Sequence, residues 1–102
     1  MAVLYSVNEI SEKLRPIFEA APIYKAILFG SYAKGTARAK SDIDIVIDSK
    51  GQLRGLDFFG VLEDVSQAFH VPVDLLEISQ IIEGDRTHDE ITKTGVTIYE
   101  RV

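Results

Sequence analysis

The segment Asp42-Ile-Asp-Ile-Val-Ile-Asp48 constrains the fold most, because polar and apolar residues alternate along it. A period of two predicts a β-strand with one face toward a core and the other toward solvent. Asp42 and Asp44 are therefore expected on the same face, with Cα atoms about 6.6 Å apart. Two ionised carboxylates this close repel each other, and a divalent cation between them would reverse that repulsion. A plain solvated strand face explains the same alternation, so this segment alone does not identify a site.

The apolar spacing of the remaining chain predicts helices and strands that alternate around this strand. A Ser6–Glu9 capping box opens the first helix, which Pro16 is expected to kink near Arg15. The predicted helices span residues 6–20, about 56–69 and part of 79–94, and the predicted strands span 25–29, 42–48, 71–76 and 96–99. The order predicts an α+β fold, a small mixed β-sheet with helices packed on one face. The helix near 56–69 can connect two parallel strands, and Pro72 restricts its strand to an edge position or a strand start.

Composition narrows the class of protein. The 102 residues are expected to form one domain, residues 1–102, and the 46% hydrophobic content is typical of a folded globule. No apolar run predicts a transmembrane helix, and the first residues do not resemble a signal peptide. The chain has no cysteine, which excludes disulfides and thiolate zinc sites and fits a cytoplasmic protein. A net charge of -5 argues against nonspecific electrostatic binding of nucleic acid.

Gly30-Ser31 follows the predicted strand 25–29 directly. A glycine at a strand end lets the backbone approach a ligand closely, and a following helical turn would direct free N–H groups at an anion. The Ser31 hydroxyl would add a further hydrogen-bond donor. A tight turn with a serine cap explains the same two residues, so they too are a weak signal when taken alone.

The combination is far more specific. Ten residues separate Ser31 from Asp42, so a phosphate-type turn at one strand end is joined to a carboxylate pair on the next strand. In this respect the chain resembles the minimal nucleotidyltransferases of the DNA polymerase β-like superfamily. Their signature is a glycine-serine turn, a spacer of about this length, and Asp-x-Asp flanked by apolar residues. The resemblance extends over the whole chain, and it implies the nucleotidyltransferase fold.

The resemblance also implies roles for individual residues. Gly30 and Ser31 would hold the triphosphate of a nucleotide, and Asp42 and Asp44 would bind two Mg²⁺ ions. Asp74 matches the family's third carboxylate on a neighbouring strand, which helps hold the metal and could serve as the base. Two such metals stabilise the entering and leaving oxygens of an in-line displacement at phosphorus.

Other charged residues near the motif have less specific interpretations. Glu77 is the rival third carboxylate, but its odd spacing from Asp74 directs it to the opposite face if the strand continues. Three basic residues could contact phosphates or an acidic partner, although exposed basic side chains are mostly solvated: Lys34, Arg38 and Lys40.

In this family, minimal proteins are often antitoxins of small all-helical HEPN-type toxins, and some transfer AMP from ATP to a toxin tyrosine. The resemblance thus implies a nucleoside triphosphate and a HEPN-type protein as partners, with no membrane and no direct nucleic-acid binding. Two alternatives stay open: a non-catalytic antitoxin that neutralises by binding, and transfer to a small-molecule hydroxyl. The sequence leaves the nucleotide preference undetermined, and it allows a homo- or hetero-oligomer.

Overall fold

The computed structural model describes residues 4–101, and it confirms the α+β fold with a mixed four-stranded sheet. The elements follow one another as α1 (Val7–Glu19), β1 (Lys25–Phe29), α2 (Gly30–Lys34), β2 (Ile43–Asp48), α3 (Gly55–Gln67), β3 (Val73–Glu77), the 3₁₀ turn η1 (Ile78–Gln80), α4 (Arg86–Thr94) and β4 (Val96–Glu100). None of the helices between residues 4 and 101 has the length and apolar character needed to span a bilayer.

The sheet has the strand order β3-β2-β1-β4. β1 pairs antiparallel with both β2 and β4, whereas β2 and β3 run parallel and are connected through α3, as predicted. β3 is an edge strand, and Pro72 directly precedes it, which satisfies the restriction that proline places on strands. β3 begins at Val73 rather than at Val71, and the Pro72 carbonyl accepts a hydrogen bond from the Ile43 amide.

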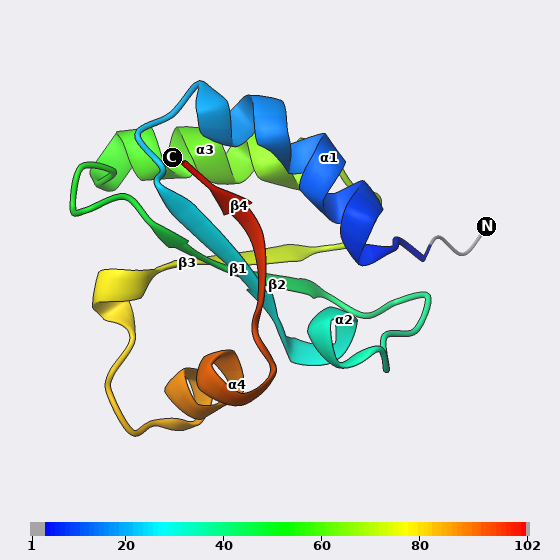
Figure 1. Ribbon diagram of the computed structural model, residues 1–102. Helices are drawn as coiled ribbons and strands as arrows, with labels where there is room; N and C mark the ends of the chain where they lie inside the picture. The colour runs from blue at the N-terminus through cyan, green and yellow to red at the C-terminus, as the bar shows by residue number, and fades with distance from the viewer. Residues whose placement is uncertain (1–3, 102) are drawn as a thin grey trace.

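The core lies between the sheet and the two longer helices, α1 and α3, which cover one face (Figure 1). β2 contributes Ile43, Ile45 and Ile47 to this core, all fully buried, as the alternation predicts. The short helices α2 and α4 lie across the strands from α1 and α3 (Figure 1). One face therefore carries the apolar core, and part of the other face is available for a site between α2 and α4.

Local signals explain how α1 begins and ends. The predicted capping box is present, since the Ser6 hydroxyl accepts from the Glu9 amide and the Glu9 carboxylate accepts from the Ser6 amide. The helix continues through Pro16 to Glu19, so the proline does not end it. At the end of α1, the carbonyls of Phe18, Glu19 and Ala21 accept hydrogen bonds from Arg101, which comes from the opposite end of the chain.

Candidate active site

The structure places Asp44 and Asp74 side by side. They are register partners on the parallel strands β2 and β3, and adjacent strands lie about 4.8 Å apart. Both alternate with core-facing neighbours, so both side chains emerge on the sheet face opposite α1 and α3. Asp44 is half-buried and Asp74 is exposed. The third aspartate predicted from sequence thus lies beside the motif aspartate.

Asp44 is the electrostatic centre of this group. The pKa of its carboxyl is raised from 3.8 to about 6, mostly by burial and then, in decreasing order, by the negative charges of Asp74, Asp42 and Glu90. All four effects disfavour the ionised form, because the charge loses hydration and stands near other negative charges. A cation placed among these carboxylates would relieve the repulsion.

Gly30 brings the phosphate-type turn into contact with Asp44. Phe29, the last residue of β1, is the register partner of Asp44, and Gly30 follows with a φ of +74°. A Cβ built on Gly30 would overlap the Asp44 carboxylate oxygen Oδ2 and stand 3.0 Å from Cγ. Only a residue without a side chain permits this approach, and the same residue tolerates the left-handed φ. The glycine of the motif therefore makes room for its second aspartate.

Asp42 and Ser31 lie at the margin of the site. Asp42 is exposed and immediately precedes β2, one residue later than the strand was predicted to begin, yet its charge reaches Asp44. Ser31 is the second residue of α2 and is half-buried. Phe29 cannot cap this short helix with its side chain, so the first amides of α2 keep their donor capacity.

Sequence reasoning missed Glu90, which the tertiary structure adds to the site. Glu90 lies in α4, and its Oε1 is 3.6 Å from the Lys34 ammonium and 3.9 Å from Arg86 Nε. It also contributes to the raised pKa of Asp44. No spacing in the sequence could have indicated this, because α4 reaches the site through the packing of α2 against α4.

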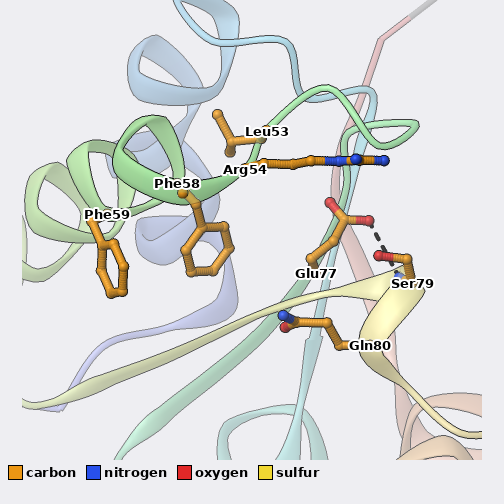
Figure 2. Close-up of a pocket in the computed structure, with 8 residues that line it drawn as sticks. Leu53, Arg54, Phe58, Phe59, Glu77, Ser79 and Gln80 are labelled. Atoms are coloured by element: carbon orange, nitrogen blue, oxygen red, sulfur yellow. Dashed lines mark hydrogen bonds between the residues drawn. The ribbon is translucent and has the colours of Figure 1, made fainter.

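Glu77, the rival third carboxylate, lies away from Asp44 and Asp74. It is buried, and it accepts hydrogen bonds from the Ser49 hydroxyl at 2.6 Å, the Ser49 amide and the Ser79 amide. Glu77 also lines a cavity of about 400 Å³ (Figure 2). The other lining residues are Leu53, Arg54, Gly55, Phe58, Phe59, Ser79 and Gln80. This cavity lies at the far ends of β2 and β3 from Asp44 and Asp74. The expectation that Glu77 faces away from Asp74 is confirmed.

The donor set fits magnesium. Between residues 4 and 101, no three His, Asp or Glu side chains are grouped so that they could hold a metal ion. Mg²⁺ does not require such a group, since it is usually bound by one or two carboxylates together with substrate phosphates and water. Asp44 and its neighbouring aspartates provide such oxygens, and Gly30 brings the start of α2 against the Asp44 carboxylate.

Comparisons with known proteins relate the chain to one family. Residues 12–102 match the family model described as polymerase beta nucleotidyltransferase. A Methanocaldococcus jannaschii protein named as a protein adenylyltransferase is 30% identical over 76 residues, which cover 74% of this chain and 82% of that protein.

Two solved structures show the same fold at low sequence identity. The first, a toxin–antitoxin complex with AMP-PNP, has a TM-score of 0.75 at 20% identity, covering 89% of this chain and 73% of that one. The second is a tri-AMPylated HEPN toxin of Shewanella oneidensis in complex with its MNT antitoxin. It has a TM-score of 0.68 at 17% identity, covering 90% of this chain and 71% of the other.

Proposed function

The chain belongs to the polymerase β-type nucleotidyltransferase family, and we propose that it transfers AMP from ATP to a tyrosine hydroxyl of a HEPN-type toxin, acting as its antitoxin. The observation that carries the proposal is the convergence of Gly30, Asp44 and Asp74, which come from three separate segments. A nucleotidyltransferase needs a phosphate-binding turn directly beside metal-binding carboxylates, and the contact of Gly30 with Asp44 beside Asp74 supports that assignment.

The protein partner is supported by the relatives. One relative is named as a protein adenylyltransferase, and one structural neighbour is an MNT antitoxin bound to a HEPN toxin that carries three AMP groups. A second neighbour is a toxin–antitoxin complex with AMP-PNP, an ATP analogue. Together these three relatives favour ATP as the nucleotide and a protein as the acceptor.

Asp42, Asp44 and Asp74 would hold Mg²⁺. When bound there, Mg²⁺ would neutralise charge on the phosphates and make the attacking hydroxyl more acidic. The raised pKa of Asp44 supports this assignment, because a group of carboxylates that repel one another gains most from a cation. In this proposal the two-ion arrangement of the family is carried over to these three aspartates.

Gly30 and Ser31 would position the nucleotide. The first amides of α2 and the Ser31 hydroxyl would donate to phosphate oxygens, and the close approach of Gly30 to Asp44 would keep that phosphate near the carboxylate. This placement would orient the α-phosphorus toward the acceptor.

Asp74 would receive the acceptor's proton. It is exposed on an edge strand, where an incoming hydroxyl can reach it. The hydroxyl oxygen would form a bond to the α-phosphorus, the bond between the α-phosphorus and the bridging oxygen would break, and pyrophosphate would leave. The hydroxyl proton would pass to the Asp74 carboxylate, because a carboxylate at hydrogen-bond distance can accept a proton as a general base.

Intact-mass spectrometry of a HEPN-type toxin from the same genome, incubated with this protein, ATP and Mg²⁺, tests the proposal. We expect a mass increase of one or more AMP units, which Asp44→Asn abolishes. Asp48→Asn is the matched control, since Asp48 lies on the same face of β2 away from Gly30 and Asn keeps its acceptor for the Lys50 amide. A stable complex without a mass shift would instead favour neutralisation by binding, and AMP transfer only to small hydroxyl compounds would favour the third alternative.

A further inference from the structure

Glu90 forms a small ionic network beside the candidate active site. Its Oε1 lies 3.6 Å from the Lys34 ammonium and 3.9 Å from Arg86 Nε. The Glu90 side chain is 27% exposed and that of Lys34 is 40% exposed, whereas Arg86 is 93% exposed. Lys34 is therefore the better-ordered partner, and Arg86 reaches Glu90 from solvent.

The network stands close to the aspartates. Lys34 ends α2, the helix that Gly30 begins in contact with Asp44. Glu90 is near enough to Asp44 for its negative charge to be felt there. A lysine ammonium is a compact charge on a flexible four-carbon stem. If Glu90 did not hold it, the Lys34 ammonium would be free to turn toward other nearby carboxylates. These include Asp89, which lines the same pocket, and Asp44, which contacts the first residue of the same five-residue helix.

We propose that Glu90 is a positioning residue that holds the Lys34 ammonium away from Asp44 and Asp74 and so keeps these carboxylates free for the metal. The inference rests on the proposed function, because it assumes that the aspartates bind a divalent cation. It assigns a role to α4, which lies outside the glycine-serine and Asp-x-Asp motif.

Calorimetric titration of the full chain with Mn²⁺ alone, at physiological ionic strength, tests the inference without ATP or acceptor. We expect Glu90→Gln to weaken Mn²⁺ binding about two- to fivefold, the range of a partly exposed ion pair. The double variant Glu90→Gln/Lys34→Met should restore the wild-type affinity, because the competing ammonium is gone.

The double variant Glu90→Gln/Arg86→Gln is the matched control. It removes the same number of charges as the Lys34 double variant, but it leaves the ammonium that would occupy the site. We expect it to bind Mn²⁺ as weakly as Glu90→Gln. Equal rescue by both double variants would mean that Glu90 acts only through the long-range effect of its negative charge, and this result would overturn the inference. An unchanged Mn²⁺ affinity in Glu90→Gln would overturn it as well.

Failure of the proposed function has a different signature. In that case the wild type would bind no Mn²⁺, or Asp44→Asn would bind it as well as the wild type. Melting temperatures of all variants establish that each one folds before its affinity is compared.

Discussion

Asp44 of β2 and Asp74 of β3 are register partners on parallel strands, and both carboxylates emerge on the face that α1 and α3 leave uncovered. Like charges directly opposite each other destabilise a sheet. Here the repulsion adds to burial in raising the pKa of Asp44 to about 6. The arrangement weakens the metal-free fold and is suited to binding a cation.

The pH dependence of stability should reveal this repulsion. The folded protein binds the Asp44 proton more tightly than the unfolded chain, whose carboxyl has a pKa of 3.8. Stability from this group is therefore full below pH 3.8, falls as the pH rises to about 6, and stays low above that. Without metal, Asp44→Asn should gain about 1 kcal/mol over the wild type above pH 6, after allowance for solvent screening. Urea unfolding at several pH values measures the gain, and a constant difference from pH 3.5 to 7.5 would contradict the prediction.

Substitution of Gly30 should separate backbone strain from loss of the site. Gly30 and Gly35 have φ values of +74° and +77°, but a Cβ at Gly35 would meet nothing within 4 Å. Both Gly30→Ala and Gly35→Ala should lose about 1–2 kcal/mol of stability for an alanine in the left-handed region, and Gly30→Ala should lose more because its Cβ would overlap the Asp44 carboxylate. Only Gly30→Ala should also lose binding of AMP-PNP with Mg²⁺, measured by calorimetry. Equal affinities in the two variants would rule out a role of the Gly30–Asp44 contact in binding.

Ser49→Ala should be strongly destabilising. The fully buried Ser49 hydroxyl donates to the Glu77 carboxylate at 2.6 Å and accepts from the Leu53 amide. Its removal leaves a buried carboxylate short of a donor, at a cost of about 2–3 kcal/mol. Ser79→Ala is the control, because Glu77 accepts from the Ser79 backbone and not from its hydroxyl. Chemical denaturation should show a change below about 0.5 kcal/mol for the control.

Arg101→Gln should loosen the end of α1. The Arg101 guanidinium donates to the carbonyls of Phe18, Glu19 and Ala21, each at 3.1 Å. The last turn of α1 contains no basic residue of its own, so Arg101 also supplies the positive charge that a helix C-terminus favours. We expect a loss of about 1–2 kcal/mol in thermal unfolding. Arg86→Gln, a substitution of a highly exposed arginine, should leave the melting temperature nearly unchanged.

Local patterns were sufficient for most elements of the fold. These patterns depend only on residues that are close in the sequence. They are the Ser6–Glu9 capping box, the alternation along β2 and the glycines at the two ends of α2. The errors are also local: β2 begins one residue after Asp42, and β3 begins at Val73 rather than at Val71. The resemblance carried by Gly30, Ser31 and the Asp42–Asp44 pair indicated the family in the same way.

The sequence by itself thus determined the elements, the fold class and the motif, because periodicity, caps and turn residues are short-range properties. Only the tertiary structure decided that Asp74 stands beside Asp44, that Gly30 touches the Asp44 carboxylate, and that Glu90 and Lys34 meet at the edge of the site. Strand order, register and helix packing bring together residues far apart in the chain. They follow from how the whole core closes, which no window of the sequence contains.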